Sequence, residues 1–199
     1  CPQHRGPSSI NWPIAMGKTR TGLSIFWPDD GLDEGPMMLQ KTCEIGPDET
    51  LGDVYFKKLF PMGVDAMIEG LELVKAGVII KHNQRLEDGS YESWFGKAAA
   101  KIDWSKPAAD IYNIIRAANP APGAWTTIDG SELKIYDSAR VDGTGTAGEV
   151  VSINEDGVTV QAEGGRILIK RVRPADGGKT AASEWAAAAG INSGTKLGS

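Results

Sequence analysis

The stretch SIFWPDDGLDEGPMMLQ, residues 24–40, decides how the first part of this chain folds. An apolar run enters it, a turn rich in aspartate and glycine follows, and a second apolar run leaves it. This pattern predicts strand, loop, strand, because Asp and Gly favour turns and the apolar runs are typical of buried strands. The loop carries four acids, Asp29, Asp30, Asp33 and Glu34. Charge beside buried strands is costly unless it is paired or used, so the acids need an explanation.

Residue chemistry alone leaves three interpretations of this acidic loop. It is a solvated turn in which Asp and Gly serve turn geometry, a divalent-metal loop, or a rigid loop that holds a catalytic carboxylate. The metal interpretation fits poorly, because the spacing lacks the alternating ligands of a calcium hand and no His or Cys lies nearby. We therefore expect no metal.

The segment GLSIFWPDDGLDEGPMMLQK, residues 22–41, resembles the folate loop of the 10-formyltetrahydrofolate-dependent formyltransferase and hydrolase superfamily. The resemblance implies that Asp33 is one of three catalytic side chains. It also implies that the loop formed by Asp29, Asp30, Gly31 and Leu32 presents backbone groups to the pteridine ring of the co-substrate. The family usually has Thr or Gly where this chain has Glu34, a position that is not catalytic.

The opening residues CPQHRG, residues 1–6, resemble the end of the superfamily's L-P-x-x-R-G motif, with Cys1 in the Leu position. In the family the catalytic Asn and His lie just upstream, so we expect the N-terminal half of the same protein to be missing here. His4 matches a variable position and is expected to be an exposed loop residue; His82 is given no role. Residues 10–16 predict a short buried helix capped by Ser8 or Ser9.

Composition is that of an ordinary globular protein, with 41% hydrophobic and 24% charged residues and a net charge of −5. No apolar run is long enough to span a membrane and no secretory signal opens the chain, so we expect a cytoplasmic protein without a membrane partner. The two cysteines form no framework, and Cys43 is expected to be a small buried residue.

We predict an α/β fold, the C-terminal part of a Rossmann-like formyltransferase domain, in residues 1–80. Within it, Thr50 and Asp53 are expected to form a near capping box for a helix that Pro61 interrupts or kinks and that Gly77 ends. The apolar positions of this helix repeat at helical spacing and are predicted to pack in the core; they are Leu51, Val54, Tyr55, Leu59, Val64, Met67, Ile68, Leu71 and Val74. Polar composition predicts a linker over residues 81–97.

Residues 98–180 are predicted to form a small OB-like antiparallel β-barrel. A helix is expected from Trp104 to Ala118, ended by the Asn119–Gly123 turn, and short alternating strands joined by Asp/Gly turns follow over residues 133–173. Residues 102–126 resemble the opening of the C-terminal domain of methionyl-tRNA formyltransferases and of the hydrolase domain of 10-formyltetrahydrofolate dehydrogenase. Residues 181–199 are predicted to be an Ala-rich helix, capped by Thr180 and Gly190, and a tail.

Two further motifs are interpreted conservatively. Residues 143–148, GTGTAG, match G-x-G-x-x-G, but a β-branched stretch follows where a dinucleotide site needs a helix, so we predict a flexible loop between strands. Arg166, Lys170, Arg171 and Arg173 cluster in sequence and would suit RNA phosphates. Because residues 98–199 carry a net charge of −1, a solvated strand face is favoured over a nucleic-acid surface.

The resemblance implies a one-carbon enzyme that uses 10-formyltetrahydrofolate as formyl donor, in the manner of methionyl-tRNA formyltransferase, with initiator methionyl-tRNA as a candidate partner. Hydrolysis of 10-formyltetrahydrofolate is the alternative, a sugar N-formyltransferase is a weaker one, and an inactive fragment remains open. In the family, His and Asn serve the oxyanion and proton transfer, and Asp orients and charges the His. There the Asp also helps to handle the proton that the nucleophile loses, and the resemblance implies this role for Asp33.

Overall fold

The computed structural model describes residues 3–198. The chain divides into two compact units, unit 1, Cys1–Phe95, and unit 2, Gly96–Ser199. Both units contain helices and antiparallel strands, so the chain is of mixed α/β content. Cys1 and Pro2, which carry the start of the motif resemblance, lie outside the described residues.

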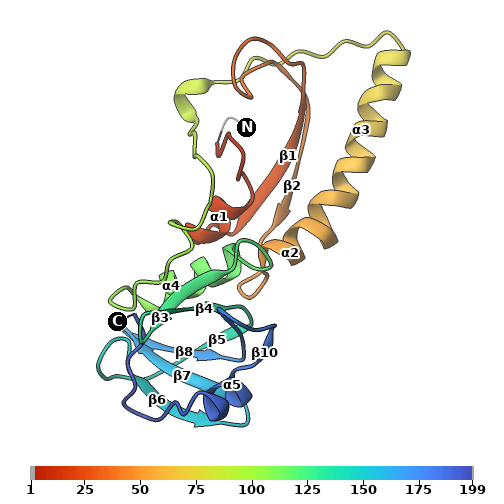
Figure 1. Ribbon diagram of the computed structural model, residues 1–199. Helices are drawn as coiled ribbons and strands as arrows, with labels where there is room; N and C mark the ends of the chain where they lie inside the picture. The colour runs from red at the N-terminus through yellow and green to blue at the C-terminus, as the bar shows by residue number, and fades with distance from the viewer. Residues whose placement is uncertain (1–2, 199) are drawn as a thin grey trace. The chain divides into compact units, whose positions relative to one another are not determined.

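Unit 1 is built around the hairpin predicted from residues 24–40. Strands β1, Arg20–Phe26, and β2, Met37–Glu44, pair antiparallel, with Ser24 opposite Gln40 and an irregularity at Ile25/Phe26. The acidic stretch forms the loop that joins the two strands (Figure 1). The strand–loop–strand prediction is therefore confirmed.

The short helix α1, Asn11–Ala15, lies in the predicted place and buries Pro13 and Ile14. Its predicted cap is wrong. The helix begins after Ile10 without a side-chain cap, and the Ser8 hydroxyl instead accepts a hydrogen bond from the Phe95 N–H at 2.9 Å. Ser8 thus joins the two ends of unit 1 rather than starting a helix.

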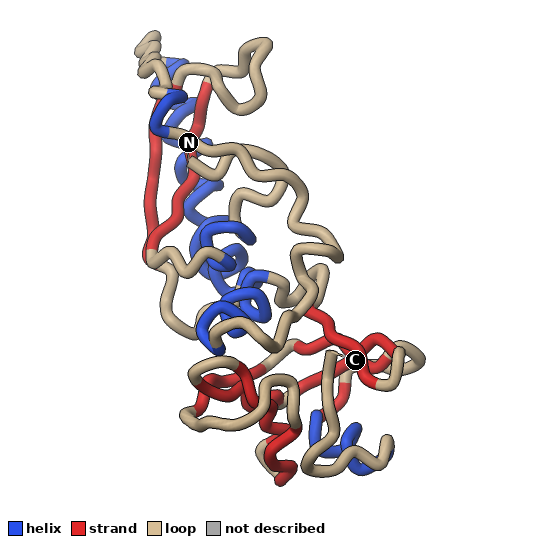
Figure 2. Tube along the Cα trace, turned by 90° about the vertical axis from the view of Figure 1, so that its left-hand side faces the viewer, coloured by secondary structure: helices blue, strands red, loops and turns tan. Residues whose placement is uncertain are grey.

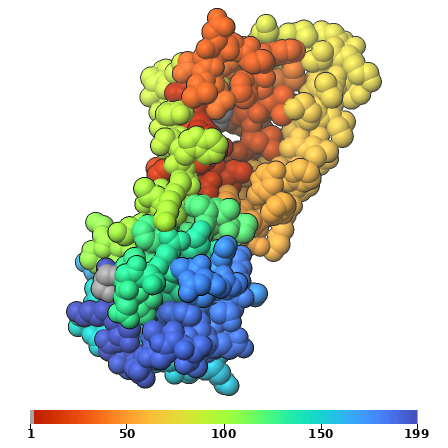
Figure 3. All heavy atoms as spheres, in the orientation of Figure 1, coloured from red at the N-terminus to blue at the C-terminus, as the bar shows by residue number. Residues whose placement is uncertain are grey.

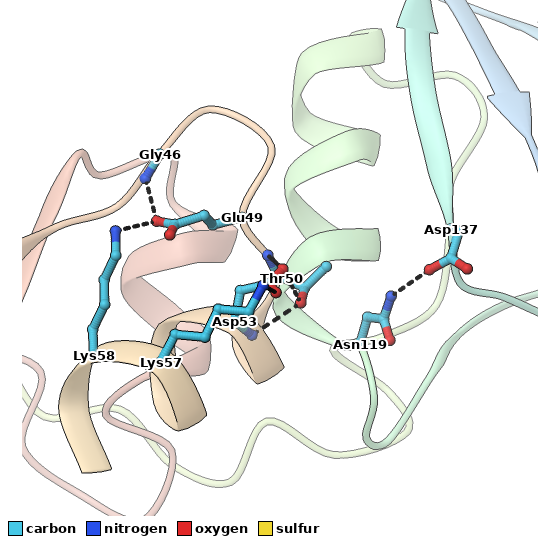
Figure 4. A network of polar contacts seen from close by, with 8 residues as sticks. All are labelled: Gly46, Glu49, Thr50, Asp53, Lys57, Lys58, Asn119 and Asp137. Atoms are coloured by element: carbon cyan, nitrogen blue, oxygen red, sulfur yellow. Dashed lines mark hydrogen bonds and ion pairs between the residues drawn. The ribbon is translucent and has the colours of Figure 1, made fainter. Parts of the chain in front are cut away.

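The helical region after the hairpin consists of α2, Leu51–Val54, the π-helical turn η1, Tyr55–Leu59, and α3, Phe60–Lys75. The predicted capping box is present, because the Thr50 hydroxyl accepts from the Asp53 N–H and the Asp53 carboxylate accepts from the Thr50 N–H (Figure 4). Pro61 is the second residue of α3 and follows the π-helical turn directly, so the regular helix is interrupted at the place predicted. Gly77, at φ +76°, ends the helix as predicted.

Of the apolar residues predicted to pack in the core along this helical region, only those near its N-terminal end are buried. Val54 and Leu59 are buried, but Val64, Met67, Ile68 and Leu71 are about half exposed. The face of α3 that meets the hairpin is made of small residues instead: Gly63 lies against Leu23, Ala66 is fully buried, and Gly70 lies against Met38. Small residues allow the helix to approach the strands closely, and this leaves the larger apolar residues on its other faces.

Unit 1 ends in a segment with little regular structure. From Val78 to Phe95 the chain runs as loop except for the single-turn 3₁₀ helix η2, Leu86–Asp88 (Figure 2). Its backbone forms isolated bridges with the rest of the unit, where His82 pairs with Met37 and Tyr91 with Arg5.

The first helix of unit 2 is α4, Ala108–Ala117, which starts four residues later than predicted and buries Ile111 and Ile115 as its spacing predicts. Two antiparallel four-stranded sheets follow, in the orders β10-β9-β4-β3 and β5-β8-β7-β6. Their strands are β3 Ala124–Ile128, β4 Ser131–Ile135, β5 Ser138–Val141, β6 Val150–Asn154, β7 Gly157–Ala162, β8 Gly165–Ile169, β9 Arg171–Pro174 and β10 Thr180–Ala181. The individual stretches that the sequence predicts as strands, residues 133–136, 150–153, 158–160 and 167–172, correspond to β4, β6, β7, β8 and β9. No individual strand was predicted at β3, β5 or β10.

The core of unit 2 comes from the alternating inward positions of both sheets. The fully buried side chains include Leu133, Ile135, Ile167, Ile169 and Val172. Helix α5, Ala182–Ala188, contacts β7 and buries Trp185. Gly190 ends α5 as predicted, but Thr180 is not its cap, because it lies in β10 and its hydroxyl donates to Glu184 at 2.8 Å.

Among residues 3–198 the hydrogen-bonded strands of unit 2 do not close into a barrel, whereas their antiparallel pairing agrees with the prediction. Within the same residues, no helix is both long and apolar enough to cross a membrane.

Candidate functional site

The turn between β1 and β2 holds every residue that the sequence assigned to a site. Its base is closed by a hydrogen bond from the Trp27 N–H to the Pro36 carbonyl at 2.9 Å. Within it the Asp29 carboxylate accepts the Gly31 N–H at 3.0 Å, which is an Asx turn. Gly35 is required here, because a Cβ at this position would overlap the Trp27 carbonyl oxygen.

Asp33 occupies the strained point of this turn. It is half-buried and its φ is +55°, a left-handed conformation that few residues other than glycine tolerate and that Asp and Asn adopt more readily than most. Its Oδ2 accepts a hydrogen bond from the Gly6 N–H at 3.2 Å, although the two residues are far apart in sequence. The carboxylate is therefore aimed toward the N-terminal segment rather than into solvent alone.

The four residues predicted to meet the pteridine ring lie on the outer part of the same turn. Asp29, Asp30, Gly31 and Leu32 are all exposed, and 56% of Leu32 is accessible. The structure thus places them next to Asp33 in one loop. Their contact with a folate stays a prediction.

The structure adds residues that the sequence did not single out. The Gln84 amide donates to the carbonyl oxygens of Asp33 at 2.9 Å and of Gly35 at 2.7 Å. The Arg5 guanidinium pairs with Glu34 at 2.6 Å. No sequence signal indicated Gln84, because it lies in a polar stretch whose composition resembles a linker.

Neither histidine lies free beside Asp33. His4, predicted to be exposed, is only 17% accessible, and its Nδ1 lies 3.2 Å from the Glu92 carboxylate. The side chain of His82 is exposed, while its backbone pairs in both directions with Met37. Among residues 3–198 there is also no group of three or more His, Cys, Asp and Glu side chains placed to hold a metal ion.

A half-buried carboxylate that accepts one backbone N–H, on a residue whose own carbonyl is also hydrogen-bonded, can orient and charge-balance a proton carrier. This is the task of an aspartate behind a catalytic base. Formyl transfer further needs a group that moves the proton and a donor for the oxyanion of the tetrahedral intermediate. His4 is engaged with Glu92, and the role of the Asp33 carboxylate in such a site stays a prediction.

The glycine-rich loop of unit 2 is explained by packing. It lies between β5 and β6, and the strand β6 follows where a dinucleotide site would need a helix, as predicted. A Cβ at Gly143 would overlap the Arg166 side chain, and Gly145 lies against Gln161. A shallow hollow of about 400 Å³ beside this loop is lined partly by these glycines and by Ser105 and Glu163.

The basic cluster does not form one patch. Arg166 lies on β8, where it donates to Gln161 at 2.9 Å and to the Thr144 carbonyl at 3.0 Å. Arg171 and Arg173 lie on β9 in the other sheet, exposed on either side of the buried Val172. This agrees with the preference for a solvated strand face.

Comparison with known proteins identifies the family to which this chain belongs. Residues 1–70 match the model of the family described as formyl transferase, and residues 96–190 match that of the formyl transferase C-terminal domain. This chain belongs to the formyltransferase family. The two matched regions lie in unit 1 and unit 2, respectively.

Within the formyltransferase family, the chain is 34% identical over 194 residues to mitochondrial 10-formyltetrahydrofolate dehydrogenase of Mus musculus, covering 92% of this chain and 21% of that protein. It is 34% identical over 197 residues to methionyl-tRNA formyltransferase of Geotalea daltonii, covering 99% of this chain and 63% of that protein. The chain therefore spans only about a fifth of the dehydrogenases that it matches.

Solved structures share the fold at lower identity. HypX from Aquifex aeolicus superposes with a TM-score of 0.80 at 18% identity, over 98% of this chain and 35% of HypX. The sugar 3N-formyl transferase WlaRD superposes with a TM-score of 0.66 at 22% identity, over 88% of this chain and 62% of that one.

Proposed function

We propose that this chain is part of a 10-formyltetrahydrofolate-dependent enzyme that transfers the formyl group to an amine, with Asp33 as a catalytic residue. The observation that carries the proposal is the fixed turn. Asp33 is held in a left-handed conformation, with its carboxylate on the Gly6 N–H and its own carbonyl on Gln84. A solvated acidic turn would not need such fastening from two distant segments.

The co-substrate part of the proposal is supported by relatives. A structure of HypX is described in complex with tetrahydrofolic acid, and WlaRD in the presence of 5-N-formyl-THF. We propose that the exposed backbone of Asp29, Asp30, Gly31 and Leu32 meets the pteridine ring of 10-formyltetrahydrofolate. No metal enters this chemistry.

In the proposed reaction the acceptor nitrogen attacks the formyl carbon, loses a proton, and the folate nitrogen is protonated as it leaves. Asp33 orients and charges the histidine that carries the proton. Because His4 is bound to Glu92 and His82 is exposed, we propose that this histidine and the oxyanion-binding asparagine come from polypeptide upstream of Cys1. An Asn-x-His-Pro-Ser stretch encoded upstream would support this part of the proposal, and a frame without one would contradict it.

The exposed apolar side of α3 supports the same view. Met67, Ile68 and Leu71 form a contiguous uncovered strip on the helix, and in the space-filling view α3 makes one outer margin of its unit (Figure 3). Contiguous exposed apolar surface marks a site of further packing. A larger catalytic domain that covers this strip is consistent with a chain that spans 63% of a methionyl-tRNA formyltransferase.

The decisive experiment uses the complete protein in which this chain occurs, with release of tetrahydrofolate from 10-formyltetrahydrofolate as the readout. We expect Asp33→Asn to lower turnover by roughly 100-fold or more, the usual contribution of a positioned proton-transfer group. Asn tolerates the left-handed conformation, so folding should be unchanged. Asp129→Asn is the matched control, since Asp129 also has a positive φ, +47°, in the β3–β4 turn of unit 2. Near-normal turnover of the Asp33 variant would refute the proposal.

The acceptor is proposed to be an amine, with initiator methionyl-tRNA as the candidate suggested by a relative's name. We further propose that unit 2 is an OB-like domain, for which the antiparallel pairing in its two sheets is partial support although its described strands do not close into a barrel, and that the enzyme is cytoplasmic. Hydrolysis is the second candidate, because several relatives are 10-formyltetrahydrofolate dehydrogenases. Parallel assays with methionyl-tRNA, an amino sugar nucleotide and water alone separate the three outcomes. Inactivity with every acceptor would favour an inert protein.

A further inference from the structure

Residues 80–95, here called the strap, follow the acidic turn and the N-terminal segment along unit 1 (Figure 1). At its start the Ile80 carbonyl accepts from the Trp27 indole N–H at 2.9 Å. His82 then pairs with Met37 at the base of the turn. The strap, whose composition predicted a linker, is thus hydrogen-bonded next to the end of β1 and at the start of β2, on both sides of the acidic turn.

In the middle of the strap, Gln84 reaches the turn itself. Its Nε2 donates to the carbonyl oxygens of Asp33 and Gly35, at 2.9 and 2.7 Å. Two carbonyl oxygens can be satisfied only by the N–H groups of the amide, so the orientation of this side chain follows from its partners. Its Oε1 is buried and makes no hydrogen bond within residues 3–198. Within the described residues, the hydrogen bonds of this amide thus go to the acidic turn.

The far end of the strap fixes the other contact of Asp33. The Arg5 N–H donates to the Ser90 carbonyl and the Glu92 N–H donates to the Arg5 carbonyl, each at 3.0 Å. Gly6 follows directly and packs against Tyr91 and Glu92 so closely that a Cβ would overlap the Glu92 carbonyl. The N–H that binds the Asp33 carboxylate is consequently placed by the strap as well.

Both restraints act on one torsion-sensitive residue. Asp33 is in a left-handed conformation, which a free turn would leave for more favourable backbone regions. Gln84 holds the peptide on its C-terminal side, and Gly6 holds its carboxylate. Without the Gln84 amide, the Asp33 backbone could leave the left-handed conformation. The carboxylate would then no longer point in a fixed direction.

We propose that Gln84 is a positioning residue for Asp33: through two carbonyl contacts it holds the turn in the conformation that aims the catalytic carboxylate. This inference rests on the proposed function of Asp33 but makes a separate claim about the strap. It assigns a role in catalysis to a side chain outside the acidic turn.

The structural claim is tested on the chain as it stands, by amide hydrogen exchange resolved by residue. Gln84→Glu keeps the shape of the side chain and removes both N–H donors. We expect exchange at Gly6 and at residues 27–37 to accelerate at least tenfold, with unit 2 unchanged. Gln161→Glu is the matched control, because its Nε2 donates to the Ala162 and Gly165 carbonyls at 2.8 and 2.9 Å within unit 2. Unchanged exchange at the turn in the Gln84 variant would overturn the inference.

The catalytic claim is tested in the complete protein by a double-mutant cycle under single-turnover conditions. We expect Gln84→Glu to lower the formyl-transfer rate tenfold or more with Asp33 present, and less than twofold in the Asp33→Asn background. A merely structural role would lower both rates by the same factor.

The outcomes keep the two proposals apart. Full activity of Gln84→Glu beside an inactive Asp33→Asn overturns the role of Gln84 and leaves that of Asp33. An active Asp33→Asn refutes the proposed function, whatever the exchange experiment shows.

Discussion

The Arg5 guanidinium lies 2.6 Å from the Glu34 carboxylate, one residue beyond Asp33. Arg5 is 11% accessible and Glu34 38%, so the pair is partly shielded from water. It ties the N-terminal segment to the acidic turn beside the Gly6–Asp33 hydrogen bond. Glu34, which has no proposed catalytic role, thus contributes to the same site by holding it.

Replacing Glu34 by Gln should therefore destabilise unit 1. The change removes the charge that Arg5 faces and leaves a shielded cation without its counter-ion, at a cost of about 2 kcal/mol in the free energy of unfolding. Urea unfolding monitored by tryptophan fluorescence measures it. Glu87→Gln is the control, because the Arg85–Glu87 pair is 75% and 70% accessible and such exposed pairs contribute little. Equal effects of the two variants would contradict the prediction.

The exposed strip of α3 predicts a contrast between neighbouring positions. Ile68 is 56% accessible whereas Ala66 is fully buried against the hairpin. Ile68→Glu should change the free energy of unfolding by no more than about 0.5 kcal/mol and should reduce self-association of the isolated chain. Ala66→Glu should unfold unit 1, because it buries an unpaired charge.

Thermal unfolding and light scattering of the two α3 variants provide the readouts. A large loss of stability in Ile68→Glu would show that the strip is covered within this chain.

The cap of α2 predicts a pH dependence of stability. Hydrogen bonds from the Lys57 ammonium and the Thr50 N–H lower the pKa of the Asp53 carboxyl to about 2, against an ordinary value of 3.8 (Figure 4). Because the pKa is lower in the folded state, the ionised carboxylate stabilises the protein fully above about pH 4. This contribution is lost as the pH falls toward about 2.

The stability gap between the native chain and Asp53→Asn should accordingly be about 1 kcal/mol at pH 7, a typical contribution of a helix cap, and should narrow below pH 4. Urea titrations at pH 7, 4 and 3 measure this gap. Asp65→Asn, at an exposed position of α3, is the control and should show no such narrowing. A gap independent of pH would contradict the assignment of the stabilisation to the carboxylate.

Local sequence determined the parts of this protein whose conformation depends on near neighbours. The acidic stretch predicted the β1–β2 hairpin, the Thr50–Asp53 pair predicted the start of α2, and Gly77 predicted the end of α3. Each of these depends on hydrogen bonds or torsion preferences spanning a few residues. The assignment of Asp33 came from the resemblance to a family and not from spacing.

Only the tertiary structure decided which residues far apart in the sequence are in contact. The face of α3 that packs is set by the small residues Gly63, Ala66 and Gly70, whereas hydrophobic periodicity indicated the neighbouring face, which carries the large apolar side chains. Gln84 meets Asp33 from 51 residues away, and no local preference marks an amide whose partners are two distant carbonyl oxygens. Periodicity in the sequence reflects only the polarity of each residue. A contact between distant residues depends on how the tertiary fold brings the two segments together.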